Sequence, residues 1–446
     1  MSAQGRNVHP ALGRVFAVVG GGISGIAVSY LLRRHGIASE ILEQSGTLGG
    51  RIGACKLGER LLDLGGKNIG RRYRRFREFT ASCGVNPYEY FGINSSQVRD
   101  GRIVTFDSKR RLRGFLELGR RCSRRDLFRF GRMCLAIRRD EENGYLGSPY
   151  FGALAERLGD PPAGSFFGEE FCRRIVRPMS IRMNGAEPDE IHIGNLGSNL
   201  RMVLDSYDQL GLGMGRVLEQ FERTATTRLG ARVESLVVRD GRIAGLRVAA
   251  GTGVAEDRFY DGIVLATPAS VSARIAALAA PRLAELLSSV RYHPVALILA
   301  EYARDVFTQE VRALVFDEEE PLSNAGSYGV HDLHIVRYTF SGRKARPYLR
   351  GAVDMEALLR LGEERLNRHI PVDRRERLRF VGRHYELGLC AYTPHYGRFA
   401  GKLQRELGTL PGLYLAGDYL CGASLEACFR AAEKCVAAIA AGWSSS

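Results

Sequence analysis

The chain of 446 residues is 45% hydrophobic and 25% charged, a composition that is typical of folded globular proteins and excludes disordered and fibrous classes. Its 64 lysines and arginines exceed its 49 aspartates and glutamates, which leaves a formal charge of +15. Such an excess indicates an acidic substrate, an anionic membrane surface, nucleic acid or only a solvated arginine-rich surface. No nucleic-acid-binding motif accompanies the charge, so nucleic acid is discounted as a partner.

The nine cysteines are scattered and follow no pattern of disulfide-bonded or metal-binding proteins. Their odd number and the lack of a C-x-x-C pair favour reduced thiols and no metal site. Residues 1–14 lack the apolar core of a signal peptide, and no run of about 18 apolar residues occurs. We therefore expect a cytoplasmic protein, while a peripheral membrane contact and the oligomeric state stay open.

Residues 15–44 read as an apolar strand, a glycine turn, an amphipathic helix and a second apolar strand, which predicts a βαβ unit. Gly20, Gly22 and Gly25 occupy the glycine positions of G-x-G-x-x-G. The first allows the tight turn, the second allows the backbone to approach a pyrophosphate, and the third allows close packing of helix on strand. A dinucleotide phosphate is expected at the helix N-terminus.

Glu43 ends the second strand, where a carboxylate can accept hydrogen bonds from both hydroxyls of an adenosine ribose. A carboxylate at this place repels the 2′-phosphate of NADP, so the choice lies between NAD and FAD. The alternative interpretation of Glu43 is an exposed residue at a strand end.

A second glycine turn follows in the sequence GTLGGRIG, and LLDLGGKNIG comes shortly after it. These segments resemble the superfamily of FAD-dependent amine oxidases, protoporphyrinogen oxidases and carotenoid desaturases. In that superfamily the second glycine turn lies along the FAD pyrophosphate, and nicotinamide dehydrogenases do not usually carry it. The resemblance therefore implies FAD.

The C-terminal segment from Leu410, LPGLYLAGDYLCGASLEACFRAAEKCVAAIA, resembles the flavin segment of the same superfamily. The resemblance places Asp418 at the ribityl chain and points the N-terminus of a helix over residues 423–440 at the isoalloxazine ring. A helix N-terminus there favours the electron-rich reduced flavin. The alternative is a simple turn at Gly417 and Asp418 before a core helix.

A central block over residues 211–271 also resembles the superfamily, with Val233 meeting the adenine through its backbone. Alternating apolar residues joined at Asp240 and Gly241 predict a β-hairpin here. Together the resemblance implies non-covalent FAD, because no cysteine stands in a recognisable attachment pattern, although Cys390 and Cys421 lie in flavin-side segments. The cofactor contacts it implies are Gly20, Gly22, Ser24, Gly25, Glu43, Gln44, Gly50, Arg51, Gly66, Lys67, Asn68, Val233, Gly417, Asp418 and Leu425.

The expected fold is α/β, a Rossmann-like FAD-binding domain interleaved with an α+β substrate domain that has a sheet over the flavin and a helical part. The FAD-binding domain is expected over residues 1–93, 202–268 and 385–446. The substrate domain is expected over residues 94–201 and 269–384. Within it, residues 290–302 and 333–340 read as strands, and residues 164–178 read as short helices.

The strand over residues 290–302 departs from many amine-oxidising relatives, which place there a lysine that is water-bridged to flavin N5 and assists reaction with oxygen. This chain has no lysine between residues 291 and 302. Tyr392 and Tyr396 are candidates for an aromatic cage beside the flavin, with His395 near, but packed aromatics are the favoured interpretation. Tyr292 and His293 likewise command no catalytic role, so catalytic residues stay unassigned.

We expect an FAD-dependent oxidoreductase of desaturase or oxidase type, which removes a hydride and a proton from a C–N or C–C bond of a small organic substrate. The acceptor is oxygen or an unassigned compound. Two alternatives are an amine or amino-acid oxidase that uses oxygen and a non-redox flavin-dependent isomerase. An anionic substrate is also considered, unless nearby acids such as Glu169 and Glu170 neutralise the arginines concerned. The arginines expected at the approach to the pocket include Arg173, Arg174, Arg177 and Arg182, of which Arg173 and Arg177 are four residues apart.

Overall fold

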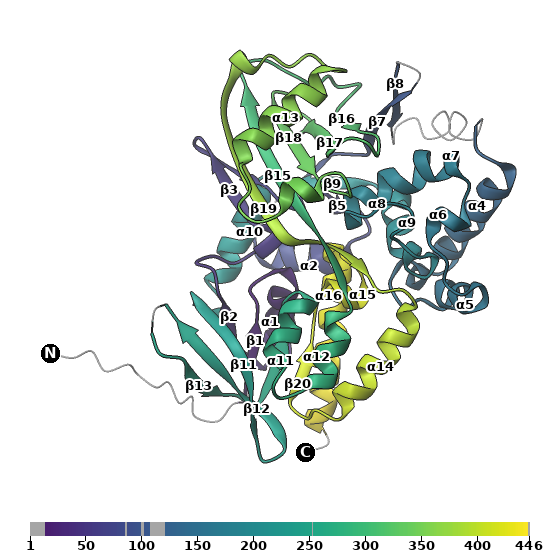
Figure 1. The fold of residues 1–446 in the computed structure, drawn as a ribbon. Coiled ribbons are helices and arrows are strands. Elements are labelled where there is room, and N and C mark those ends of the chain that lie inside the picture. The colour runs from purple at the N-terminus through teal and green to yellow at the C-terminus, as the bar shows by residue number, and fades with distance from the viewer. Residues whose placement is uncertain (1–13, 85–86, 100–101, 108–120, 252, 445–446) are drawn as a thin grey trace.

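The computed structural model describes residues 14–84, 87–99, 102–107, 121–251 and 253–444 (Figure 1). Residues 1–13, which carry most of the argument about a signal peptide, lie outside the described residues. Two sheets, one mainly parallel and one mainly antiparallel, stand one above the other in Figure 1, with a group of helices at the side. Chain segments from both ends and from the centre meet in the parallel sheet.

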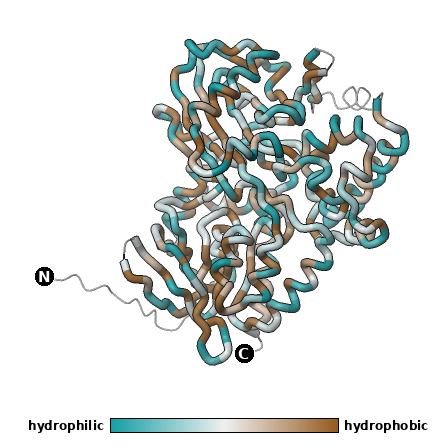
Figure 2. The backbone as a smooth tube through the Cα atoms, in the orientation of Figure 1, coloured by the Kyte–Doolittle hydropathy of each residue, from teal (hydrophilic) through white to brown (hydrophobic). Residues whose placement is uncertain are grey.

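The parallel sheet has the strand order β10-β2-β1-β14-β20, and all its pairings are parallel. Its strands span Thr226–Leu229 (β10), Ala38–Glu43 (β2), Val15–Val19 (β1), Gly262–Leu265 (β14) and Leu413–Leu415 (β20). Successive residues of β1 enter the cores on opposite faces of the sheet, which is the pattern of a strand buried on both sides. Figure 2 shows hydrophobic segments along these inner strands.

Helices cover one face of this sheet, and α1 and α16 pack against each other there. These helices are α1 (Ile23–Arg34), α2 (Arg74–Ser82), α10 (Gly213–Glu222) and α16 (Leu425–Ser444). The opposite face shares a core with α11 (Ala269–Ala276), α12 (Pro281–Ser288), α14 (Tyr396–Gly408) and the antiparallel sheet β11-β12-β13. The strands of that small sheet are β11 (Ala231–Arg239), β12 (Arg242–Ala250) and β13 (Glu256–Phe259).

The β11–β12 hairpin is the one that the sequence predicts. Asp240 and Gly241 have φ values of +51° and +74°, the left-handed conformations that a two-residue type I′ turn needs.

The second large sheet has seven strands in the order β19-β15-β18-β17-β16-β7-β8. They span Arg377–Tyr392 (β19), Arg291–Tyr302 (β15), Ile335–Phe340 (β18), Leu322–Ser327 (β17), Ala313–Val315 (β16), Asn94–Arg99 (β7) and Arg102–Asp107 (β8). Helix α13 (Met355–Asn367) covers one face. The other face packs against the hairpin of β3 (Ala54–Leu57) and β4 (Arg60–Asp63), which precedes the 64–68 segment.

The helical part lies beside this sheet in Figure 1, and its helices pack around a hydrophobic core of their own. Its helices are α4 (Arg124–Arg139), α5 (Pro149–Leu158), α6 (Ala163–Phe166), α7 (Glu169–Phe171), a π-helical turn (Cys172–Val176), α8 (Arg177–Asn184) and α9 (Leu196–Leu204). A three-stranded sheet of β5 (Ile69–Gly70), β9 (Tyr207–Leu210) and β6 (Tyr88–Tyr90) joins it to the glycine-turn segments. Within the described ranges, no helix is both long and apolar enough to cross a bilayer.

Candidate FAD site

The first glycine turn connects β1 to α1 with a geometry that only glycine allows. Gly20 has a φ of +104°, and its N–H donates to the carbonyl of Leu42 at 2.8 Å. A Cβ on Gly25 would lie 1.9 Å from the carbonyl oxygen of Gly20, so the helix packs directly on the turn. A Cβ on Gly22 would meet nothing within 4 Å, and Gly22 caps α1 without a side chain. This leaves room for a phosphate at the helix N-terminus.

Glu43 is fixed at the carboxyl end of β2, beside the glycine turn. Its Oε2 accepts from the N–H of Gly21 at 2.6 Å, and its Oε1 accepts from the N–H and the hydroxyl of Ser45 at 2.8 and 2.9 Å. A carboxylate offers about four acceptor sites, so these three bonds leave roughly one. The hydroxyls of a ribose would therefore bind here by replacing a bond from the exposed Ser45.

The second glycine turn lies against the first. Gly49, with a φ of +109°, donates its N–H to the carbonyl of Gly21 at 2.8 Å and forms a parallel β-bridge with Gly22. A Cβ on Gly50 would come within 3.4 Å of the Cα of Gly22. The two turns thus form one cradle of backbone, and added side chains would crowd it at Gly25 and Gly49.

Arg51 extends from this cradle and makes an ion pair with the C-terminal segment, buried on the side of Asp418 and partly exposed on the side of Arg51. Its Nη1 lies 2.7 Å from Oδ2 of Asp418 and also donates to the carbonyl of Gly388 at 3.3 Å. Burial alone would lower the pKa of Arg51, but the Asp418 carboxylate more than offsets this and raises it. Tyr292 donates its hydroxyl to Oδ1 of Asp418 at 2.7 Å and accepts from the N–H of Ala269.

The remaining predicted contacts are spread around the same centre. Ser24 and Leu425 are buried at the starts of α1 and α16, which pack together, and Gly417 precedes the short helix α15 (Asp418–Cys421). Val233 is half-buried in β11, and Gln44 is exposed beyond β2. The structure therefore brings the three sequence blocks together, while the contact of each residue with FAD stays a prediction.

The segment after the second turn places Gly66, Lys67 and Asn68 toward the seven-stranded sheet. Gly66 is exposed between the buried residues Gly65 and Lys67. Asn68 is half-buried, and its Oδ1 has no hydrogen-bond partner. The ammonium of Lys67 lies 4.0 Å from the ring centroid of Tyr328 and 4.8 Å from that of Phe91, and it too has no hydrogen-bond partner.

The aromatic candidates near the C-terminus are packed side chains, the interpretation that the sequence favoured. Tyr392 and Tyr396 are 3% and 5% exposed. The hydroxyl of Tyr392 accepts from the N–H of Ala423 at 3.0 Å, and Tyr396 donates to the carbonyl of Leu420 at 2.5 Å. Both tyrosines thus position the C-terminal segment. His395 has a φ of +50° and donates its backbone N–H to Asp160 at 2.6 Å.

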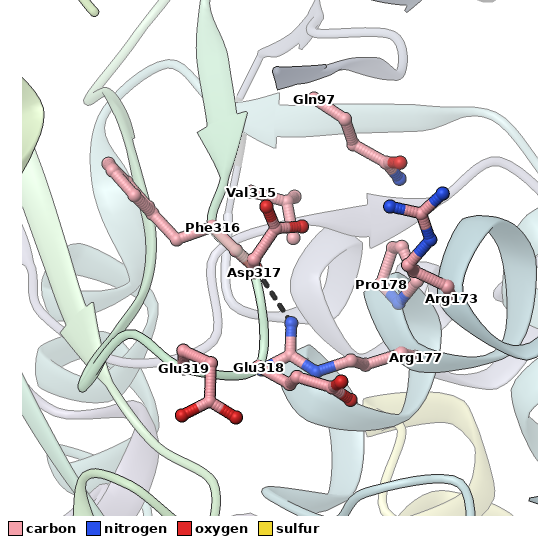
Figure 3. Close-up of a pocket in the computed structure, with 9 residues that line it drawn as sticks. All are labelled: Gln97, Arg173, Arg177, Pro178, Val315, Phe316, Asp317, Glu318 and Glu319. Atoms are coloured by element: carbon pink, nitrogen blue, oxygen red, sulfur yellow. Dashed lines mark hydrogen bonds between the residues drawn. The ribbon is translucent and has the colours of Figure 1, made fainter. Parts of the chain in front are cut away.

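The idea that Arg173 and Arg177 make a positive approach to the pocket is wrong. Arg173 pairs with Glu170 at 2.5 Å, and Arg177 is buried and pairs with Glu187 at 2.7 Å. Both line a cavity of about 200 Å³ whose wall also carries the carboxylates of Asp317, Glu318 and Glu319 (Figure 3). Acidic neighbours therefore neutralise both arginines, as the alternative interpretation held.

Sequence reasoning missed the residues that long-range contacts bring to the centre. Tyr292 gave no signal beyond its place in a strand. Arg337 did give one, because it is a charged residue between apolar neighbours in β18. Its Nη1 donates to the carbonyl of Gly65 at 2.9 Å, which ties the seven-stranded sheet to the glycine-turn segment.

These residues fit FAD. Two adjoining glycine turns offer open backbone at Gly22, a carboxylate stands at the end of β2, and the Arg51–Asp418 pair joins both ends of the chain. Arg51 would hold the pyrophosphate side and Asp418 the ribityl side, while Glu43 would hold the adenosine ribose.

Comparison with known proteins agrees with this interpretation. Residues 23–440 match the model of the family described as flavin containing amine oxidoreductase. The fold is similar to cyclohexylamine oxidase from Brevibacterium oxydans (TM-score 0.71, 16% identity, 97% of this chain and 100% of that one). It is also similar to putrescine oxidase bound to putrescine (TM-score 0.72, 14% identity, 96% and 99%).

A further similar structure is a fatty acid isomerase from P. acnes that produces CLA (TM-score 0.64, 13% identity, 94% and 97%). At such identities a structural likeness indicates the fold alone. The family match, in contrast, spans nearly the whole chain. The chain therefore belongs to the flavin-containing amine oxidoreductases and is an FAD-dependent oxidoreductase.

Proposed function

We propose that this oxidoreductase removes a hydride and a proton from a C–N or C–C single bond of a small or medium organic substrate, giving an imine or an alkene. FAD, when bound, supplies the hydride acceptor. The protein's part is to hold the reacting carbon at a near-attack distance of about 3–3.5 Å and to keep water away. An amine or amino-acid oxidase that uses oxygen is the alternative within the same class.

The observation that carries this proposal is the apolar face of β15. Val295, Leu297 and Leu299 are 5%, 5% and 0% exposed, and they pack against Leu62 and Leu64, which lead into the 65–68 segment. This face carries no lysine, and its one carboxylate, Glu301, lies at the end of the strand and pairs with Arg379 at 3.0 Å. Such a face supports a reaction in which the chain supplies position rather than a strong base.

Anaerobic mixing tests the proposed reaction. The holoenzyme would be mixed without oxygen with a panel of primary amines, amino acids and saturated cyclic ketones or acids. Lasting bleaching of the yellow flavin with one class supports the proposed reaction and names the bond. Turnover without lasting bleaching contradicts it.

The acceptor is a second part of the proposal. Because β15 lacks the lysine that the superfamily resemblance associates with the reaction of oxygen, we expect slow reoxidation by oxygen. The test compares reoxidation of photoreduced holoenzyme by air and by menadione. Faster reoxidation by menadione supports an acceptor other than oxygen, whereas fast reoxidation by air favours the oxidase alternative.

A flavin-dependent isomerase is the second candidate function. It is supported by the fold's likeness to the fatty acid isomerase, within the limits of 13% identity. The anaerobic experiment separates the two, because an isomerase converts substrate in excess over flavin while the flavin ends oxidised.

We also propose that FAD is bound without a covalent link. Cys390 is fully buried beside Asp418, and burial, followed by the Asp418 charge, raises the pKa of its thiol. Because the thiolate is the reactive form, this environment disfavours attachment. Acid precipitation should release the flavin into the supernatant, and flavin that stays on the pellet contradicts the proposal.

We also propose which parts of the chain bind FAD and which bind the substrate. Residues 1–93, 202–268 and 385–446 bind FAD, of which 1–13, 85–86, 252 and 445–446 lie outside the described residues. Residues 94–201 and 269–384 bind substrate, of which 100–101 and 108–120 lie outside them. One change to these bounds is part of the proposal: residues 269–288 belong with the cofactor half instead, which is supported by the core that α11 and α12 share with β1 and β14.

A further inference from the structure

Three cationic side chains lie where the 65–68 segment meets the seven-stranded sheet, and among the residues that the structure describes none of them has a carboxylate in direct contact. The first is Lys67, which is 6% exposed and whose ammonium has no hydrogen-bond partner. It lies over the ring faces of Tyr328 and Phe91. A buried ammonium without a carboxylate partner is costly, and protein structures normally avoid it.

The second cation is Arg337 on β18. One of its nitrogens donates to the carbonyl of Gly65, while its buried Nε has no partner. Burial lowers the pKa of Arg337 to about 10, and the nearby positive charge of Arg182 contributes to the lowering. No carboxylate therefore compensates this guanidinium directly.

The third cation is Arg182 on α8. Within the described residues its one hydrogen bond is a 3.5 Å contact with the hydroxyl of Ser95, too long to hold the side chain firmly. Its side chain is exposed, yet protein surrounds it closely enough that burial lowers its pKa. Arg182 thus combines an exposed side chain with surroundings that disfavour its charge.

The nearest carboxylates do not balance these charges. Asp63 is buried near Lys67 and accepts from the N–H of Met214 at 2.8 Å, and its proximity partly supports the charge of Lys67. Asp332 forms a 2.8 Å pair with Arg60. Arg312 adds a further positive charge near Lys67.

We propose that Arg182 and Arg337 form a subsite for the carboxylate of an amphipathic substrate. Lys67, which the family resemblance counts among the cofactor contacts, would instead provide positive potential behind this subsite. Guanidinium groups match a carboxylate in geometry and make the stronger, charge-assisted hydrogen bonds. The apolar part of the substrate would lie along the adjoining cluster of Val295, Leu297 and Leu389. The inference deepens the proposed function and rests on it for the place of the reacting bond.

The subsite is one residue away from the cofactor cradle. A Cβ on Gly65 would lie 1.8 Å from the carbonyl oxygen of Arg51, so Gly65 packs directly on the residue that pairs with Asp418. Arg337 binds the other side of the same glycine. A carboxylate held there would fix the substrate at a constant distance from the cofactor, as oriented catalysis requires.

Binding of redox-inert ligand pairs to the holoenzyme tests the subsite. The pairs are phenylacetate with phenylacetamide and octanoate with octanamide, followed by calorimetry and by the change in flavin absorbance. We expect the wild-type protein to bind each carboxylate about tenfold or more tightly than its amide. Arg182→Met should abolish that preference, and Arg182→Lys should restore part of it.

The matched control is Arg132→Met, which removes an exposed arginine from α4 and the same formal charge. It should leave the preference for the carboxylates unchanged. An equal loss in Arg132→Met overturns the proposal, because it would mean that the effect is one of net charge.

Two further results overturn the proposal. One is equal binding of carboxylate and amide by the wild-type protein, which decides the matter even if the variants do not fold. The other is a loss of bound FAD in Arg182→Met while the preference for carboxylates persists. That result would mean that Arg182 binds an anionic group of the cofactor and not the substrate. A failure of the proposed redox function appears separately, as a lack of flavin bleaching while the ligand preference persists.

Discussion

The cofactor cradle and the neighbouring cationic subsite differ in whether their charged side chains have partners. In the cradle, Glu43 makes three hydrogen bonds and Arg51 pairs with Asp418 at 2.7 Å. In the subsite, Lys67 has no hydrogen-bond partner and Arg182 makes one long contact. Fixed partners suit a resident cofactor that is always present. Uncompensated charge suits a ligand that comes and goes, because the ligand brings the missing partner.

The largest effect is expected from closing the cradle sterically. Gly25→Ala places a Cβ 1.9 Å from a backbone oxygen that cannot move without opening the turn. We expect loss of FAD and a destabilisation of about 3 kcal/mol or more. Gly152→Ala is the control, since Gly152 is also helical and its Cβ would meet nothing within 4 Å. It should stabilise by about 1 kcal/mol.

Denaturant unfolding and the flavin content of the purified proteins measure this contrast. If Gly25→Ala keeps a full complement of FAD, the turn does not hold the pyrophosphate and the cradle is misplaced.

The next effect concerns the ion pair that joins the two ends of the chain. Asp418→Ala leaves Arg51 without its carboxylate, and Arg51 is 33% exposed while Asp418 is 5% exposed. Removing one partner of a fully buried pair costs about 3–5 kcal/mol, so for this partly exposed pair we expect about 2–3 kcal/mol. Asp189→Ala, which breaks an exposed pair with Arg343, should cost about 0–1 kcal/mol.

Urea unfolding of both aspartate variants checks this difference. Similar midpoints for the two would mean that water or FAD, rather than Asp418, compensates the charge of Arg51.

A smaller effect, on FAD binding, should distinguish Glu43 from Asp63, two carboxylates that lie close to the glycine turns. Glu43→Ala should weaken FAD binding about 10- to 100-fold, because the net gain is about one charge-assisted bond of roughly 1.5–3 kcal/mol once a ribose hydroxyl has replaced Ser45. Asp63→Ala should mainly lower stability, since Asp63 accepts from the N–H of Met214 and supports the charge of Lys67. Titration of apoprotein with FAD measures both. Equal weakening would contradict the assignment of Glu43 to the ribose.

Much of the cofactor half could be predicted from the sequence because the patterns that specify it are local. Gly20, Gly22 and Gly25 stand within one turn of chain, and the turn at Asp240 and Gly241 lies between two alternating strands. Each pattern has one physical cause, such as a positive φ or a close approach, which acts over a few residues. The strands β15 and β18 were also predicted close to their observed bounds.

The contacts between distant segments could not be predicted from the sequence, in the cofactor half as well as in the substrate half. Arg51 meets Asp418 across 367 positions, and Arg337 meets Gly65 across 272. No local pattern specifies such pairs. The error over Arg173 and Arg177 has the same origin, since Glu187 approaches Arg177 through the fold and a helical spacing does not reveal it. A charged residue inside a buried strand, such as Arg337, is the one signal that a sequence offers.

The smallest effect tests the unpaired charge itself. Burial, followed by the charge of Arg337, lowers the pKa of Lys67 from 10.5 to about 7. The groups that face Lys67 are Arg337, Asp63, Asp332 and Arg312. Between pH 7 and 10.5 the unfolded chain holds the proton that the folded chain has lost, so the stability of the protein should rise with pH there.

Lys67→Met removes this contribution. Between pH 7 and 8 the wild-type protein should gain about 1 kcal/mol of stability relative to the variant, the result of titrating one group with a folded pKa near 7. Lys402→Met, on the exposed surface of α14, should behave as the wild type. Saturating phenylacetate should flatten the pH dependence of the wild type, because an anion beside Lys67 favours its charged form and raises its pKa. If the free energy of unfolding of the wild-type protein changes with pH as that of Lys67→Met does, Lys67 keeps its proton in the folded protein without a bound anion. The contrast between the paired charges of the cradle and the unpaired charge of Lys67 would then be wrong.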